Sequence, residues 1–155
     1  MQICEVERCR LKKFWNTSLT QMLSPFLFNV KKVAMWLDGN QITGTIPTEI
    51  GLMTDLASFS IANSTLSGTI PDEIGNLHQL RRLWLFNNKL TGSIPQALNK
   101  LELLEVVELH GNKLVGDMPQ GVCSSVVNSD YEYKSLTSDC LKEVGCERSC
   151  CTQCF

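Results

Sequence analysis

The stretch that decides the fold runs from residue 80 to residue 101 and is LRRLWLFNNKLTGSIPQALNKL. Its first half alternates apolar and other residues, which predicts a short strand with one buried face. Asn88 follows where the chain must turn, and its amide can both donate to and accept from backbone groups of that turn. Gly92 allows a backbone geometry that other residues resist, and Pro95 fixes φ shortly after it. The spacing of residues 96–101 predicts a short helical turn.

Copies of this unit recur every 24 residues, so the same residue type returns in register. The repeated columns are Gly44, Gly68, Gly92 and Gly116; Pro47, Pro71, Pro95 and Pro119; Asn40, Ser64, Asn88 and Asn112; Met35, Phe59, Leu83 and Val107; Leu37, Ile61, Leu85 and Leu109; Ile42, Leu66, Leu90 and Leu114; and Ile46, Ile70, Ile94 and Met118. A single unit cannot bury its apolar side, but stacked units can, with parallel strands about 4.8 Å apart. The sequence predicts an α/β solenoid of four full repeats over residues 33–122, with caps formed by residues 1–32 and 123–155.

The unit L-x-x-L-x-L-x-x-N-x-L-x-G-x-I-P-x-x-L-x-x-L resembles the plant-type leucine-rich repeat, most closely in its L-x-G-x-I-P half. This resemblance implies a right-handed, horseshoe-like superhelix with a parallel inner sheet, a second set of short strands around the T-G-x-I-P segments, and short helices outside. The plant-type leucine-rich-repeat family includes receptor-like-protein ectodomains and polygalacturonase-inhibiting proteins. Such proteins are usually extracellular, bind proteins, peptides or carbohydrates, and perform no chemistry. The asparagines that recur every 24 residues form a column of turn hydrogen bonds, the asparagine ladder. Ser64 replaces asparagine in the second repeat, so we expect fewer hydrogen bonds there.

The two ends are less regular than the repeats. Residues 1–32 contain enough apolar side chains to cover the first coil, and Ser24–Val30 could be the end of a degenerate unit. The apolar side chains are Phe14, Trp15, Leu19, Met22, Leu23, Phe26 and Phe28. We expect this region to be a degenerate N-terminal cap.

Eight cysteines lie at the ends of the chain. They are Cys4, Cys9, Cys123, Cys140, Cys146, Cys150, Cys151 and Cys154. A disulfide-stapled C-terminal cap is the leading interpretation, because this segment is short and closes a solenoid. Zinc is the alternative, since Cys151-x2-Cys154 is half of a metal knuckle. The closing CERSCCTQCF also resembles the cysteine-rich tail of secreted algal leucine-rich-repeat proteins.

The cysteines favour an oxidising compartment, whereas the start of the chain lacks the apolar core of a secretory signal. Either the chain derives from a longer secreted or surface protein, or it is a cytoplasmic fragment with reduced thiols. Asn16-Thr17-Ser18 and Asn63-Ser64-Thr65 match the glycosylation sequon. No apolar run approaches the ~20 residues that a membrane span requires.

Composition and motifs argue against two broad function classes. The net charge of −2 and pI near 5.7 do not suit a nucleic-acid binder. The two histidines, His78 and His110, belong to different columns, and no nucleotide, esterase or metalloprotease motif is present. We therefore expect neither catalysis nor a cofactor.

The strand pattern predicts which side chains face the open side of the inner sheet. The three columns are Ala34, Ser58, Arg82 and Val106; Trp36, Ser60, Trp84 and Glu108; and Asp38, Ala62, Phe86 and His110. We expect Arg82, Trp84 and Phe86 to share one strand and one face, with Trp36 two strands away, roughly 10 Å. Aromatic residues and arginine often anchor interfaces. The alternative is that these aromatics are ordinary exposed residues or pack against a missing repeat.

The predicted ligand-binding residues are Trp36, Asp38, Arg82, Trp84, Phe86, Glu108 and His110. The favoured function is a recognition module that binds a protein, peptide or carbohydrate on its concave face. The alternatives are a secreted inhibitor of a cell-wall-degrading enzyme and a structural spacer without ligand.

Overall fold

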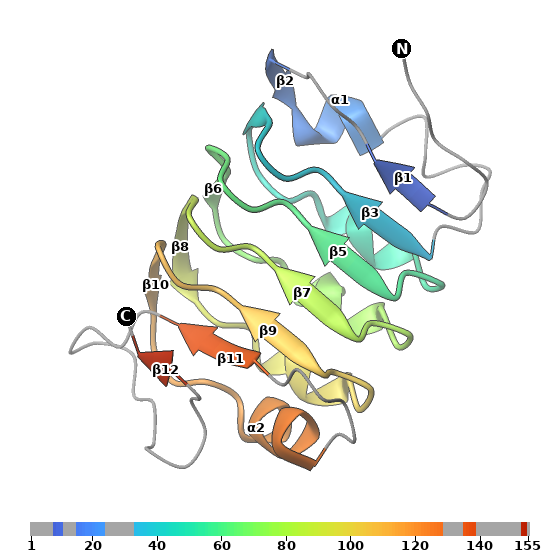
Figure 1. The fold of residues 1–155 in the computed structure, drawn as a ribbon, viewed down its shortest axis with the longest axis vertical. Coiled ribbons are helices and arrows are strands. Elements are labelled where there is room, and N and C mark those ends of the chain that lie inside the picture. The colour runs from blue at the N-terminus through green and yellow to red at the C-terminus, as the bar shows by residue number, and fades with distance from the viewer. Residues whose placement is uncertain (1–7, 11–14, 24–32, 129–134, 139–152, 155) are drawn as a thin grey trace.

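The computed structural model describes residues 8–10, 15–23, 33–128, 135–138 and 153–154 as a stack of similar coils (Figure 1). Each coil contributes one strand to a parallel inner sheet with the order β1-β3-β5-β7-β9-β11-β12. The bounds are β1 Arg8–Arg10, β3 Ala34–Trp36, β5 Ser58–Ser60, β7 Arg82–Trp84, β9 Val106–Glu108, β11 Ser135–Ser138 and β12 Gln153–Cys154. The architecture is therefore the predicted α/β leucine-rich-repeat solenoid.

The inner sheet extends beyond the four predicted repeats at both ends. Within those repeats, Ala34, Ser58, Arg82 and Val106 pair in the expected 24-residue register. At the N-terminal side β1 pairs with β3, and at the C-terminal side β11 pairs with β9. The chain lengths joining these outer strands depart from the 24-residue period, so the sequence repeat did not reveal them.

A second set of short strands lies beside the inner sheet, as the resemblance implied. The bounds are β2 Trp15–Ser18, β4 Gln41–Thr43, β6 Ser67–Gly68, β8 Lys89–Ser93 and β10 Lys113–Val115. The strands form two parallel sheets, β10-β8-β6 and β2-β4. The repeat glycine permits this turn: Gly92 has a φ of +79°, and an added Cβ would lie 2.7 Å from the Thr69 methyl carbon.

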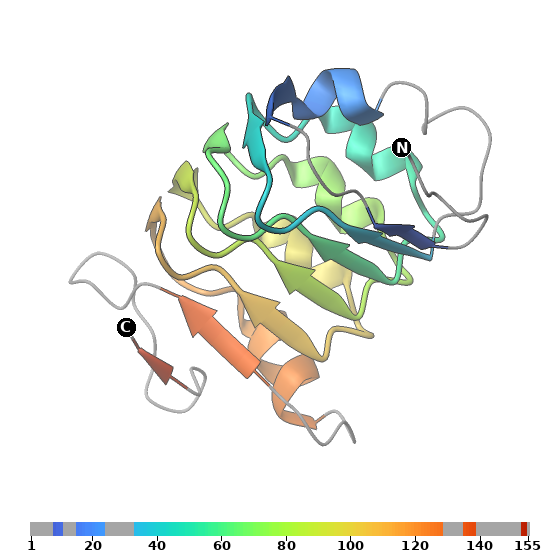
Figure 2. The same ribbon diagram turned by 45° about the horizontal axis from the view of Figure 1, so that its top comes forward.

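Short helices cover the side of the coils away from the inner strands (Figures 1 and 2). The bounds are α1 Leu19–Leu23, η1 Thr48–Leu52, η2 Asp72–Asn76, η3 Gln96–Lys100 and α2 Gln120–Asn128. Each 3-10 helix begins directly after the repeat proline, whose fixed φ suits a helix start. The helices stack closely, because a Cβ added to Gly75 would lie 2.6 Å from the Ala97 carbonyl oxygen.

The core lies between the inner strands and the outer helices. All four apolar columns of the repeat are buried there, from the strand pair Met35 and Leu37 to the terminal Met118. Leu19 of the expected N-terminal cap is also fully buried. The remaining apolar residues expected in that cap, and Ser24–Val30, lie outside the residues whose side chains are described.

The asparagine ladder works as the sequence predicted. The Asn88 amide nitrogen donates to the Ile61 and Leu85 carbonyls at 2.7 and 3.1 Å. Its oxygen accepts from the Leu66 N–H at 3.1 Å. Ser64 is too short for this role, and its hydroxyl donates to the Asn40 carbonyl. The hydrogen-bond column is therefore weaker at the second repeat.

Helix α2 spans residue 123, where the C-terminal cap was expected to begin, and it packs Val122 and Val126 against the core. Cys123, half-buried on the same helix, is disulfide-bonded. The other seven cysteines lie outside the residues whose side chains are described. None of the helices in the described part of the chain combines the length and apolarity needed to cross a membrane.

Candidate ligand-binding face of the inner sheet

The candidate site is the solvent side of β3, β5, β7 and β9. Side chains alternate along each strand, so the buried columns leave Trp36, Trp84 and Glu108 on the opposite face. The parallel register places Trp36 beside Ser60, Ser60 beside Trp84, and Trp84 beside Glu108. One row across the sheet therefore carries two indoles and a carboxylate.

Five residues expected to be open on this face are buried. They are Ala34, Ser58, Ser60, Ala62 and Val106. Strands in a sheet are only about 4.8 Å apart, so large side chains on neighbouring strands cover small ones between them. Ser60 shows this effect, because it lies between two tryptophans and is 2% exposed.

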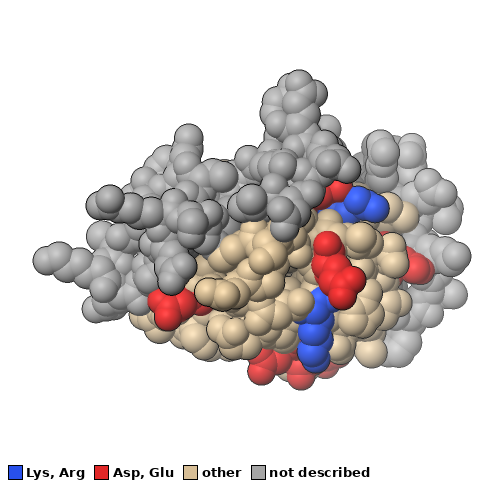
Figure 3. Space-filling view, turned by 90° about the horizontal axis from the view of Figure 1, so that it is seen from below, with Lys and Arg blue, Asp and Glu red and all other residues tan. Residues whose placement is uncertain are grey.

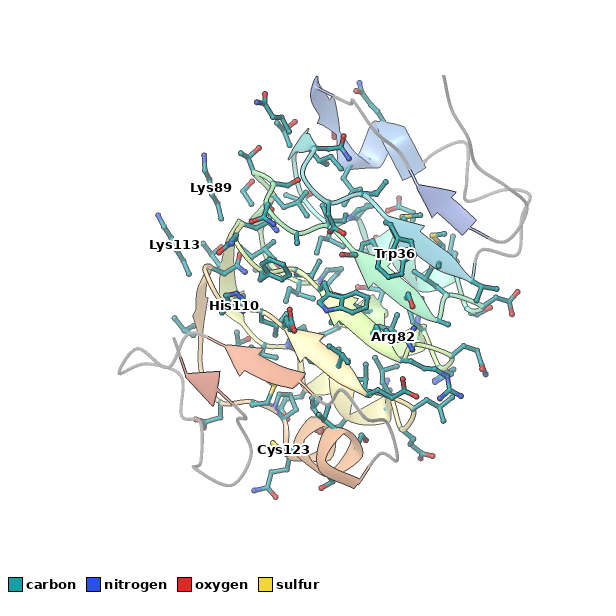
Figure 4. The ribbon with its side chains drawn as sticks, in the orientation of Figure 1. Trp36, Arg82, Lys89, His110, Lys113 and Cys123 are labelled. Atoms are coloured by element: carbon teal, nitrogen blue, oxygen red, sulfur yellow. The ribbon has the colours of Figure 1, made fainter. Side chains whose placement is uncertain are left out.

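Trp36 and Trp84 meet although their strands are not adjacent. Their ring centroids are 5.3 Å apart, with an angle of 35° between the ring planes. This separation is much shorter than the roughly 10 Å expected between alternate strands, because the short Ser60 side chain leaves room for the indoles to converge. Both rings are partly exposed, and Figure 4 shows Trp36 over the inner strands.

A second aromatic pair lies just past the ends of the strands. Phe86 and His110 stack with centroids 4.9 Å apart and an angle of 6° between their planes. β7 ends at Trp84, so Phe86 lies beyond the strand rather than on it, which corrects the sequence prediction. The expected cluster of Arg82, Trp84 and Phe86 is thus divided, because each ring pairs across the sheet instead of along the chain.

The charged groups of this face fall into two sets. Glu105 forms ion pairs with Arg81 at 2.7 Å and with Arg82 at 3.7 Å, on the amino-terminal side of the strands. Asp38 Oδ1 accepts hydrogen bonds from the Ser60 hydroxyl and, at 2.7 Å, from the Ala62 N–H. Sequence analysis missed Arg81 and Glu105, although opposite charges exactly one repeat apart were a usable signal.

The remaining predicted residues lie away from the aromatic row. His78 is exposed outside η2, so the two histidines do not meet. Asn63 is exposed with a φ of +52°, and its side-chain oxygen accepts from the Asn87 amide at 2.8 Å. Asn16 contributes backbone to β2, and its side chain is not described.

The described residues include no metal site, and the face seen from below carries no broad basic area (Figure 3). No group of three or more His, Cys, Asp or Glu among the described residues could hold a metal ion, and the zinc alternative falls outside them. Seen from below, acidic and basic side chains are scattered over the described surface without a broad basic area (Figure 3). Lys89 and Lys113 project outward from the second sheet (Figure 4).

Comparisons with known proteins agree with this architecture. The family model of the leucine-rich repeat matches residues 79–101. No curated protein matches the chain. The crystal structure of a TDR receptor is 38% identical over 61% of this chain and 16% of its own, with a TM-score of 0.58.

Two further structures come from Arabidopsis. The leucine-rich-repeat ectodomain of the Arabidopsis thaliana membrane receptor kinase GASSHO1/SCHENGEN3 is 30% identical over 69% of this chain and 13% of its own, with a TM-score of 0.61. The receptor kinase HAESA is 29% identical over 80% of this chain and 20% of its own, with a TM-score of 0.62. The chain thus spans about a fifth or less of each of these structures. With its 24-residue unit, parallel inner sheet and asparagine ladder, the chain belongs to the plant-type leucine-rich-repeat proteins.

Proposed function

We propose that this chain is a non-catalytic recognition module that binds a peptide or protein ligand on the inner face, outside the cell or at its surface. The observation that carries the proposal is the row of partly exposed aromatic rings, in which Trp36 meets Trp84 and Phe86 meets His110. Rigid aromatic side chains bury a large area at low entropic cost, so they anchor many interfaces.

The similar structures support the choice of ligand. GASSHO1/SCHENGEN3 was crystallised in complex with CASPARIAN STRIP INTEGRITY FACTOR 2, and HAESA with the peptide hormone IDA and the co-receptor SERK1. The extracellular location is supported by the similarity to GASSHO1/SCHENGEN3, whose matched structure is a receptor ectodomain, and by the disulfide bond of Cys123, which an oxidising compartment favours.

A binding screen tests the proposed function. The chain, produced in a secretory host, is screened against a displayed library of random peptides, with cell-wall oligosaccharides as a separate arm. Trp84→Ala should weaken captured peptide ligands by about tenfold or more, because truncated hot-spot aromatics commonly cost that much. Leu52→Ala is the matched control, since Leu52 is 68% exposed on η1 at the outer side. Equal binding by Trp84→Ala and the unmodified chain would contradict the proposal, and capture of oligosaccharides alone would reassign the ligand.

The proposed location has its own measurement. Intact mass before and after alkylation without reductant should show no added alkyl groups, because all cysteines are expected to be paired. Treatment with a peptide N-glycosidase should lower the mass, and by less when Asn63 is replaced by Gln, since Asn63 is exposed within its sequon. Several alkylated thiols would overturn the extracellular assignment and favour a reduced, cytoplasmic chain.

A further inference from the structure

We infer that the inner face holds a basic side chain of its ligand, an arginine or a lysine, between the Trp84 indole and the Glu108 carboxylate. The inference rests on the recognition function proposed above and names the chemistry of one contact. Trp84 and Glu108 are direct partners in the parallel register of β7 and β9, and both side chains are partly exposed. Direct partners across parallel strands stand about 4.8 Å apart, so one cationic group can touch both.

Glu108 has no ion-pair partner among the described residues. The two salt bridges on this side of the molecule both use Glu105, with Arg81 at 2.7 Å and Arg82 at 3.7 Å. Arg82 is thereby held toward the residue that precedes β9 rather than toward Glu108. The Glu108 charge is left for a ligand to neutralise.

The aromatic neighbours add attraction for a cation. The negative face of an indole ring attracts an ammonium or guanidinium group, and tryptophan is the strongest of the aromatic side chains in this respect. Trp36 lies at 5.3 Å from Trp84 with its plane inclined by 35°, so the two rings form one continuous aromatic surface. Asp38, exposed two residues after Trp36, adds a second negative charge at the carboxyl ends of the strands.

Other ligand groups suit this row less well. An apolar anchor over Trp84 would remove water from the Glu108 carboxylate without replacing its hydrogen bonds, which carries a desolvation cost. An anionic group would be repelled by both Glu108 and Asp38. A basic side chain satisfies the rings and the carboxylate together, so charge complementarity selects it.

The test compares two probe peptides that differ in charge but hardly in shape. They are acetyl-Gly-Gly-Arg-Gly-Gly-amide and the same peptide with citrulline in place of arginine. Binding to the full-length chain is followed by tryptophan fluorescence and by NMR shifts of the indole N–H groups. We expect the arginine peptide to bind about threefold to thirtyfold more tightly, the combined range for an exposed ion pair and a cation–π contact.

Matched variants assign the preference to Glu108. Glu108→Gln should reduce the ratio of the two dissociation constants to about twofold to fivefold, because the side-chain shape is kept, the ion pair is lost and only the cation–π contact still favours arginine. Glu102→Gln, the same charge change at an exposed glutamate that does not face the aromatic row, should leave the ratio unchanged.

Three results would overturn the inference: equal binding of the two peptides, a preference that Glu108→Gln leaves undiminished, or no binding of either peptide at millimolar concentration. None of them affects the library screen with Trp84→Ala. Failure of the basic subsite is therefore distinguishable from failure of the recognition function.

Discussion

Strands β5 and β7 are neighbours in the same parallel register, but they present contrasting side chains on the inner face of the sheet. Both bury one large side chain at their centre, Phe59 on β5 and Leu83 on β7. Toward the ligand side, β5 presents Ser58 and Ser60, which are covered, whereas β7 presents Arg82 and Trp84, which are partly exposed.

The difference indicates that this solenoid keeps its stabilising side chains and its proposed ligand-binding side chains in separate columns. The buried columns and the ladder residue hold the coil together, so they constrain the sequence of every repeat. The outward columns carry no such constraint. The small residues of β5 also take part in the site indirectly, because they leave the space in which Trp36 and Trp84 meet.

The largest expected effect comes from the shared core. Phe59→Ala and Leu83→Ala should each lower the free energy of unfolding substantially, by about 3–5 and 2–5 kcal/mol, because both side chains are fully buried. Urea unfolding followed by circular dichroism measures both losses. Leu52→Ala, an exposed position, should change stability by less than about 0.5 kcal/mol. A small loss at either strand would mean that the two coils are not equally part of the core.

The ladder position should give the next largest effect, with opposite signs in the two repeats. Asn88→Ser should destabilise by about 2 kcal/mol, because the Ile61 carbonyl and the Leu66 N–H lose their partner. Ser64→Asn should stabilise by about 0.5–1.5 kcal/mol by completing the column. Urea midpoints of the two variants are compared with the unmodified chain. If Asn88→Ser has no effect, the ladder does not explain why the repeat requires asparagine.

Filling the space between the tryptophans should affect the site more than the fold. Ser60→Leu should push the indoles apart and remove a contact worth about 0.5–1.5 kcal/mol. Near-ultraviolet circular dichroism should lose the signal of the coupled indoles, and peptide ligands should bind more weakly. Ser67→Leu, at an exposed position of β6, is the control that should leave both unchanged. An unchanged indole signal in Ser60→Leu would show that Ser60 does not determine the ring geometry.

The smallest effect is expected at residue 81, where the repeat of β7 carries an exposed arginine and the repeat of β5 carries alanine. Arg81 pairs with Glu105 at 2.7 Å; the Arg81 side chain is 46% exposed, so solvent screens that end of the pair, and Arg82, 3.7 Å away, still accompanies the 12%-exposed Glu105 side chain when Arg81 is removed. Arg81→Ala should cost about 0.2–1 kcal/mol, less at high salt, since exposed ion pairs contribute little. Ala57 occupies the corresponding place one repeat earlier, which indicates that the coil tolerates alanine there. A salt-independent loss of several kcal/mol would mean that Arg81 has a structural role beyond this pair.

Most of the repeated architecture was predictable because each coil packs against near-copies of itself. The 24-residue period determined the inner strands β3, β5, β7 and β9, their register, the buried columns and the role of Asn88. It could not reveal β1, β11 and β12, because their pairing follows from contacts at the ends of the stack and not from a repeated spacing.

The sequence predicted which residues belong to the candidate site but not how their side chains are arranged. Sequence alternation placed Trp36, Trp84 and Glu108 on the same face, because side chains of a strand point to alternate sides. Only the tertiary structure decided that Ser60 is covered, that the indoles meet across it, and that Arg82 faces Glu105. These outcomes depend on which side chains from different coils compete for the same space and charge, and that competition exists only once the coils are stacked.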